Sequence, residues 1–165
     1  MRGADITQEH LFSTVHLDEF VPQNHPLRAI RQLFNTALGR INWLLDTAYS
    51  DIGRESIPPE RLLRAQLLQV FYSIRSERQL MEQINYNLLF RWFTGLSIDD
   101  KVWDHSTFTK NRDRLLEHDI IPSLFEEIVI LARKKDLLSD EHFSVDGTLI
   151  QAWASQKSFR PKDEN

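Results

Sequence analysis

The segment Pro59-Glu-Arg-Leu-Leu-Arg-Ala-Gln-Leu-Leu-Gln-Val-Phe-Tyr-Ser-Ile74 decides the fold class of this chain. Its apolar residues are spread nearly all round a helix instead of along one stripe, namely Leu62, Leu63, Ala65, Leu67, Leu68, Val70, Phe71 and Ile74. A helix of this kind is usually central and covered on several sides. The chain is therefore predicted to be mainly α, with this helix at the core of a helical domain over residues 21–138.

A long helix is predicted before the central segment, over residues 26–49. Pro26 stands at its first position, where proline is favoured, and the apolar residues that follow keep the i, i+3, i+4, i+7 spacing of one helical face. These residues are Leu27, Ile30, Leu33, Phe34, Ala37, Leu38, Ile41, Leu44 and Leu45. Upstream, Pro22 and Pro26 interrupt the pattern, so residues 1–20 are expected to form an N-terminal arm.

Shorter helices are predicted after the central segment. Their expected ranges are 77–84, 85–93, 106–117 and 123–135. Ser76-Glu-Arg-Gln79 has the form of a capping box, Gly95 is suited to close the second helix, and Asp104 or Ser106 is suited to cap the third. The first three have the lengths of a helix-turn-helix cluster, a motif that often binds DNA.

The helix predicted over residues 106–117 carries candidate DNA contacts. Phe108, Leu115 and Leu116 are predicted on one side. The polar residues predicted on the opposite side are Thr107, Lys110, Asn111 and Arg114. Lys and Arg can hold phosphates, and Asn and Arg can read base edges. The alternative is a solvated helix face, because Lys and Arg are balanced by Asp and Glu across residues 75–117 and give no electrostatic footprint.

The composition is that of an ordinary globular protein. The chain has 165 residues, with 41% hydrophobic and 27% charged residues and a net charge of −4. The absence of cysteine excludes disulfides and thiolate metal sites, and a reducing cytoplasm is the expected compartment. No run approaches the roughly 18 apolar residues of a membrane span, so no membrane partner is expected. The acidic balance argues against a dedicated nucleic-acid binder, but a mixed surface can still hold a local basic face.

One β-type run stands near the C-terminus, in the segment Phe143-Ser-Val-Asp-Gly-Thr-Leu-Ile150. Asp146 lies there between apolar residues, and an acid inside a strand is costly unless it is paired or binds a metal. Gly147 also permits an ordinary Asp-Gly turn after a strand. From these residues alone, Asp146 is either a turn residue or a metal ligand.

Several longer runs occur in order along the chain. They are Phe20-Val-Pro-Gln-Asn-His-Pro-Leu-Arg28, Leu67-Leu-Gln-Val-Phe-Tyr-Ser-Ile-Arg-Ser-Glu-Arg-Gln-Leu80, Asn87-Leu-Leu-Phe-Arg-Trp-Phe93, Val102-Trp-Asp-His-Ser-Thr-Phe-Thr-Lys-Asn-Arg-Asp-Arg114, Phe143–Ile150 and Ala152-Trp-Ala-Ser-Gln-Lys-Ser-Phe-Arg-Pro161. With these runs, residues 11–161 resemble the N-terminal half of a transposase of the IS5-like insertion-sequence group, within the IS4/IS5 superfamily.

The resemblance implies a helical N-terminal domain joined to an RNase H-like catalytic domain with a DDE triad. Asp146 matches the first acid of that triad, and residues 139–165 would begin the catalytic domain, with 143–150 as its first strand. In the family, three carboxylates hold divalent metal, normally Mg²⁺, for phosphoryl transfer at the transposon ends. The implied partner is DNA that carries the terminal inverted repeats.

The sequence ends at Asn165, and none of its other acids matches the second Asp or the Glu of the triad. A single carboxylate cannot fix two metal ions. We therefore expect a truncated transposase that keeps at most DNA-end binding or assembly, binds no Mg²⁺ stably and does not cut or join DNA alone. Two alternatives stay open, an interaction module that inhibits full-length transposase and a relic without function.

Overall fold

A computed structural model describes residues 16–49 and 56–138 of the chain. Within these ranges the chain forms helices and no strand, which confirms the mainly α prediction. The helices are α1 (Leu17–Phe20), α2 (Pro26–Arg40), α3 (Asn42–Ala48), α4 (Pro59–Phe71), α5 (Glu77–Tyr86), α6 (Leu88–Thr94), α7 (His105–Glu117) and α8 (Ile120–Lys134). The predicted strand over 143–150, with Asp146, lies outside the described residues.

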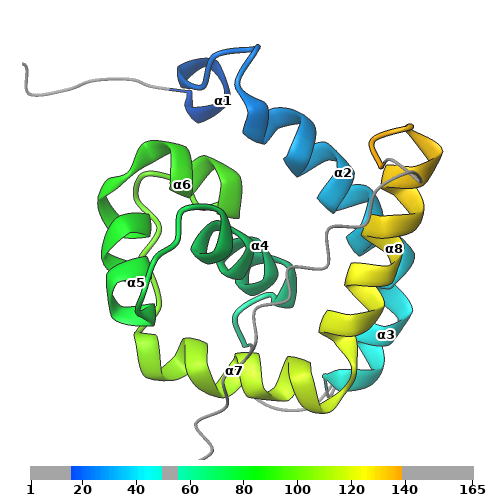
Figure 1. The fold of residues 1–165 in the computed structure, drawn as a ribbon. Helices are drawn as coiled ribbons and strands as arrows, with labels where there is room; N and C mark the ends of the chain where they lie inside the picture. Colours follow the sequence, from blue (N-terminus) through cyan, green and yellow to red (C-terminus); the bar gives the residue numbers. More distant parts are fainter. Residues whose placement is uncertain (1–15, 50–55, 139–165) are drawn as a thin grey trace, which may run out of the picture.

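Helix α4 lies in the middle of the fold, with the other helices arranged around it (Figure 1). It contacts α5, α6 and α7, and it buries four apolar side chains in the core, those of Leu62, Leu63, Ala65 and Leu68. The central position predicted for this segment is therefore confirmed.

The end of α4 departs from the prediction of a helix that is covered on several sides. Val70 is 68% exposed, Phe71 49% and Tyr72 45%. Tyr72 packs on Phe90 of α6, with ring centroids 4.8 Å apart, but within the described residues all three side chains keep a large part of their surface exposed. An apolar residue favours burial, but its type does not show whether another part of the chain packs against it.

The single helix predicted over residues 26–49 is wrong, because two helices occupy this range. Ile41 separates α2 from α3, with φ −96° and ψ 9°, and its N–H lies within hydrogen-bonding distance of the carbonyls of both Ala37 and Leu38. Gly39 weakens the helix just before the break. Ile41 and Leu45 are both buried, so the apolar spacing continues through the break and hides it from a search for periodicity.

The start of α2 was predicted correctly at Pro26. The imidazole Nδ1 of His25 accepts a hydrogen bond from the N–H of Leu27 at 3.2 Å, which satisfies one of the free donors of the first turn. The described part of the expected arm, residues 16–20, contains the single turn α1. This turn contacts α6, and Val21 behind it is 1% exposed.

The helices α5, α6 and α7 form the cluster of short helices that the sequence predicted. Ser76 caps α5 by accepting a hydrogen bond from the N–H of Gln79 at 3.2 Å. Gly95 closes α6 in the left-handed conformation, with φ 86°, which glycine adopts without strain. Helix α5 contacts both α6 and α7. A tight turn over residues 72–76 joins α4 to this cluster.

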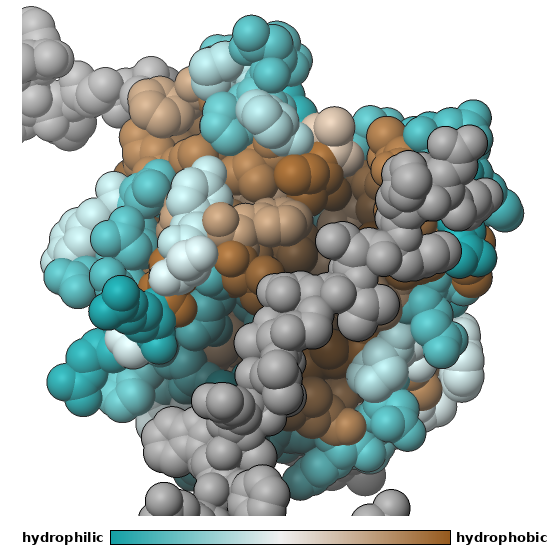
Figure 2. Space-filling model, in the orientation of Figure 1, coloured by the Kyte–Doolittle hydropathy of each residue, from teal (hydrophilic) through white to brown (hydrophobic). Residues whose placement is uncertain are grey.

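The last helix, α8, begins at Ile120, earlier than the predicted Ser123, and lies beside α2 (Figure 1). Arg40 of α2 and Glu127 of α8 form an ion pair at 2.8 Å across this contact. On the face shown in Figure 2, apolar residues gather across the middle, where Figure 1 places α4, and hydrophilic residues surround them. None of the helices in the described ranges is long and apolar enough to cross a membrane.

Candidate nucleic-acid interface

Helix α7, which carries the predicted DNA contacts, is fixed at its start by Asp104. The Oδ1 atom of Asp104 accepts hydrogen bonds from the backbone N–H of Ser106 at 2.8 Å and from its hydroxyl at 2.6 Å. These bonds hold the pKa of the Asp104 carboxyl below its usual range. Of the two capping residues considered, Asp104 is therefore the N-cap, and Ser106 lies inside the helix.

Three of the four predicted contacts, Thr107, Lys110 and Arg114, are exposed. They are spaced i, i+3, i+7, so they form one stripe along the outer side of α7. The helix is anchored by the neighbouring Phe108 and Leu115, which are 1% and 0% exposed. The structure therefore keeps these three side chains together on a surface that a large ligand can reach.

The placement predicted for Asn111 is wrong. This residue is only 8% exposed and lies on the buried side with Phe108 and Leu115. Its side-chain amide donates a hydrogen bond to the carbonyl of Thr107 at 2.8 Å. Conversely Leu116, which was predicted on the buried side, is 50% exposed. The spacing 108, 111, 115 is that of one helical face, and the polar character of Asn111 obscured it.

Arg114 lies against Tyr49, the residue that follows α3. Its guanidinium carbon lies 5.3 Å from the centroid of the Tyr49 ring, which is the geometry of a cation–π contact. Burial raises the pKa of the Tyr49 hydroxyl above its ordinary value. The contact restricts Arg114, so its charge is presented from a fixed position on the surface of α7.

A polar contact joins α7 to α5. Glu77 of α5 accepts hydrogen bonds from the hydroxyl of Thr109 and from the guanidinium of Arg112, both on α7. Arg112 also pairs with Asp113 at 3.1 Å. The charge of Arg112 is therefore neutralised within the protein, which leaves Lys110 and Arg114 as the cations of the exposed stripe.

A buried arginine organises the loop that leads into α7. Arg91 of α6 is 5% exposed. Its guanidinium donates hydrogen bonds to the carbonyls of Asn85 at 3.1 Å, Ser97 at 2.6 Å and Asp100 at 3.0 Å. A buried charge is tolerated only when its donors are satisfied. Arg91 thus ties the end of α5 to the 97–100 loop.

A second cationic site, which was not predicted from the sequence, surrounds Trp92 of α6. Arg28 and Arg31 of α2 lie over the Trp92 ring, with guanidinium carbons 5.2 Å and 4.5 Å from its centroid. The indole N–H donates to Asp18 at 2.9 Å, and this bond contributes most to a lowered pKa of the Asp18 carboxyl. Arg64 of α4 adds a third guanidinium, whose positive charge interacts with that of Arg31. We call Arg28, Arg31, Arg64 and Trp92 the Trp92 arginine cluster.

A sequence signal for this cluster did exist. Arg28, Arg31 and Asn35 are spaced i, i+3, i+7 and therefore share one face of α2. The contribution of Arg64 could not be foreseen, because it depends on how α4 packs against α6.

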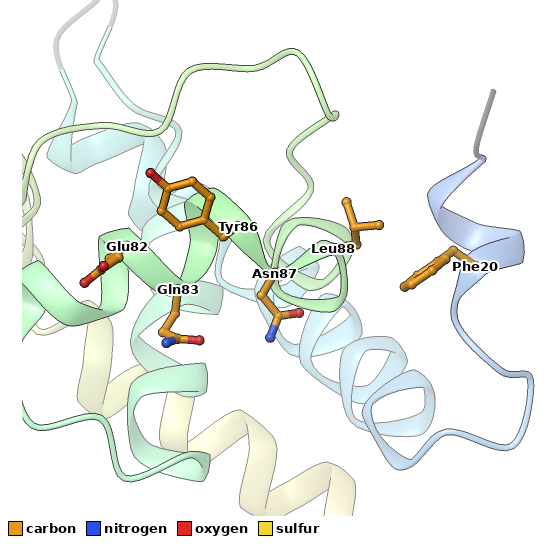
Figure 3. Close-up of a pocket in the computed structure, with 6 residues that line it drawn as sticks. All are labelled: Phe20, Glu82, Gln83, Tyr86, Asn87 and Leu88. Atoms are coloured by element: carbon orange, nitrogen blue, oxygen red, sulfur yellow. The ribbon is translucent and has the colours of Figure 1, made fainter. Parts of the chain in front are cut away.

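An open hollow lies between α1 and the junction of α5 and α6 (Figure 3). Its lining residues are Phe20, Glu82, Gln83, Tyr86, Asn87 and Leu88. In Figure 3 the Phe20 ring faces Leu88 across the gap, whereas Glu82 and Tyr86 come from α5. This lining has one carboxylate and no cation, so it does not suit an anionic ligand.

Within residues 16–49 and 56–138, no group of three or more His, Asp or Glu side chains could hold a metal ion. Asp146, the predicted metal ligand, lies outside these ranges. The residues that the structure describes therefore do not fit a Mg²⁺ centre.

Comparison with known proteins gives one family. A transposase domain family (DUF772) matches residues 15–114, a range that runs from α1 to the Arg114 turn of α7. No solved structure matches the chain.

Proposed function

Because the chain belongs to the transposase domain family DUF772, we propose that it is the DNA-end-binding and assembly region of an IS5-like DDE transposase. The observation that carries this proposal is the family match over residues 15–114, which covers α5, α6 and α7 as far as Arg114, one of the exposed cations of α7. The DNA partner would be the terminal inverted repeats of the element that encodes the chain.

The exposed stripe of α7, Thr107, Lys110 and Arg114, is the surface proposed to meet DNA. Lysine and arginine neutralise phosphates, and a threonine hydroxyl can donate to phosphate or base. Asn111 is excluded from this surface by its burial. With a net charge of −4, the chain as a whole does not attract DNA, so binding must rest on local groups of this kind.

Asp146 is proposed, from the resemblance of its Asp-Gly-Thr context alone, as the first carboxylate of the DDE centre, with Mg²⁺ as the metal of the parent activity. The activity proposed for the residues that the structure describes is binding of transposon ends.

The proposal is tested by fluorescence polarisation of a labelled inverted-repeat duplex with the full chain. Lys110→Gln and Arg114→Gln each remove one charge from the stripe, and each is expected to lower affinity on the order of tenfold and to reduce the salt slope by about one. Lys134→Gln is the matched control, because Lys134 is exposed at the end of α8. Equal affinities of all three variants would contradict an interface on α7.

A second candidate function is association with another transposase chain. It is supported by the three exposed apolar residues at the end of α4, Val70, Phe71 and Tyr72, since contiguous exposed apolar groups mark protein contacts. Val70→Asp is expected to abolish co-sedimentation with a second copy or with full-length transposase and to leave DNA affinity unchanged. Co-sedimentation that survives this substitution would exclude the surface.

A further inference from the structure

We propose that Arg31 and Arg64, together with Asn35, form a binding site for a phosphate group above the Trp92 ring. All three lie where α2, α4 and the end of α6 meet: Arg64 Nε donates to Asn35 Oδ1 at 3.0 Å, and Arg64 Nη1 lies 3.4 Å from the carbonyl of Thr94. The inference deepens the proposed function. It rests on that proposal only where it names DNA as the source of the phosphate.

The arginines of the Trp92 cluster are not equivalent. Arg28 pairs with Asp18 at 3.1 Å and donates to the carbonyls of Pro22 at 3.1 Å and Val21 at 2.8 Å. Its donors are therefore used within the protein, where they fasten the turn after α1 to α2. This is a structural role, and it leaves Arg28 as a fixed neighbour of the site.

Arg31 has no such partners. Its Nε atom is buried and finds no hydrogen-bond partner in the described part of the chain. Arg64 donates to two neutral oxygens. Among residues 16–49 and 56–138, no carboxylate lies within 4 Å of either guanidinium. A buried donor without a partner is costly, and an acceptor oxygen of an anion would satisfy the Nε–H of Arg31.

The two positive charges also disfavour one another. Burial is the main cause that lowers the pKa of both Arg31 and Arg64; the charge of Arg31 lowers the pKa of Arg64 further, and the charge of Arg28 lowers that of Arg31. The nearby acids that act against this are Asp18, which is shared with Arg28, and Glu60 at the start of α4. Two partly buried cations with so little compensation form a site of positive potential.

The site is also held in place before any ligand arrives. Trp92 is 5% exposed, and its ring makes a cation–π contact with Arg31. Arg64 is fixed by its hydrogen bonds to Asn35 and Thr94. Little side-chain freedom remains to be lost when a ligand binds. Guanidinium groups match phosphate oxygens in paired hydrogen bonds, so phosphate is the ligand chemistry that fits. Its source is either the DNA backbone or free inorganic phosphate.

The test uses the full chain in a buffer free of phosphate. Inorganic phosphate is titrated at constant ionic strength while the Nε–H signals of Arg31 and Arg64 are followed by NMR. In parallel, affinity for a DNA duplex is measured from about 50 to 200 mM salt. The variants are Arg31→Gln and Arg64→Gln, with Arg31→Lys as a second variant that keeps the charge. Circular dichroism confirms that each one is folded.

Arg75→Gln is the matched control. Arg75 is exposed in the turn that follows α4. Tyr72 in that turn packs on Phe90 in the first turn of α6, with ring centroids 4.8 Å apart, whereas Arg64 reaches Thr94 at the end of α6. The control therefore removes one charge at the opposite end of α6 from the site.

Phosphate is expected to shift both Nε–H signals saturably in the unchanged chain and in Arg75→Gln. In Arg31→Gln the shift of the Arg64 signal is expected to disappear, and in Arg31→Lys it is expected to recover in part. With DNA, Arg31→Gln and Arg64→Gln are each expected to reduce the salt slope by about 0.9. Shifts with phosphate in a chain that binds no DNA would support the site and overturn the proposed function. DNA binding with unchanged slopes and no phosphate shift would overturn the site and leave the proposed function standing.

Discussion

The substitution Arg91→Met tests whether one buried guanidinium holds the loop before α7. Methionine keeps an apolar stem of similar length and removes every donor. Three hydrogen bonds from the charged group to the carbonyls of Asn85, Ser97 and Asp100 are lost. Hydrogen bonds to charged groups contribute about 1.5–3 kcal/mol each, which sets an upper limit of about 4.5–9 kcal/mol for the three.

The net loss is expected to be smaller, about 2–4 kcal/mol. Asn85, Ser97 and Asp100, which supply the three carbonyls, are exposed or half-exposed. Water can therefore bind these carbonyls in place of the guanidinium in the variant. The substitution also removes the cost of burying a charge. A loss of this size lowers the unfolding temperature of a chain of this length by about 5–15 °C.

The free energy of unfolding is measured by urea titration, followed by circular dichroism at a helical wavelength. Arg78→Met is the control, because Arg78 lies exposed on α5, and its loss is expected to change stability by less than about 0.5 kcal/mol. Amide exchange in residues 97–100 should also accelerate in Arg91→Met. A loss below about 1 kcal/mol, or one equal to that of the control, would refute the role assigned to Arg91.

Three further predictions concern stability. Gly39→Ala is expected to stabilise the chain by about 0.5–1 kcal/mol, since an added Cβ there meets no atom within 4 Å. Gly95→Ala should destabilise it by about 1–2 kcal/mol, because φ is 86°. Thermal unfolding checks both, and the two shifts of the unfolding temperature are expected to have opposite signs. The Asp18 carboxyl has a lowered pKa in the folded chain, so its contribution to stability is present above the unfolded pKa and is lost as the pH falls through the folded pKa. The NMR signal of the Trp92 indole N–H should shift in that acidic range. Asp18→Asn should abolish this shift. Asn111→Ala is expected to lower the free energy of unfolding by about 1–2 kcal/mol and to leave the DNA affinity of the folded chain within about twofold. A large loss of affinity without a loss of stability would show that Asn111 contacts DNA.

The sequence predicted the helix ends most accurately where a cap defines them. Ser76 and Gly95 were found in their predicted roles, and of the two caps considered for α7, Asp104 and Ser106, the structure has Asp104. The break at Ile41 has no such marker, because the apolar face continues through it. It follows from the packing of α2 and α3 in the folded chain.

The candidate site shows a similar division. Thr107, Lys110 and Arg114 were correctly placed on the exposed side of α7, since helical periodicity decides that side. Arg91 and Arg64 were not foreseen, because Arg91 donates to backbone carbonyls, which residue type does not reveal, and Arg64 contacts Asn35 and Thr94, which lie far from it in the sequence. Such contacts appear only after the chain has folded.

The most direct test of the central claim is binding of the full chain to the inverted repeats that flank its own gene. Affinity is compared at fixed salt with a duplex of the same composition in scrambled order, because affinities depend strongly on salt. Binding to the inverted repeat that is at least about a hundredfold tighter is predicted for recognition of transposon ends. Equal affinity for the two duplexes would contradict the proposed function.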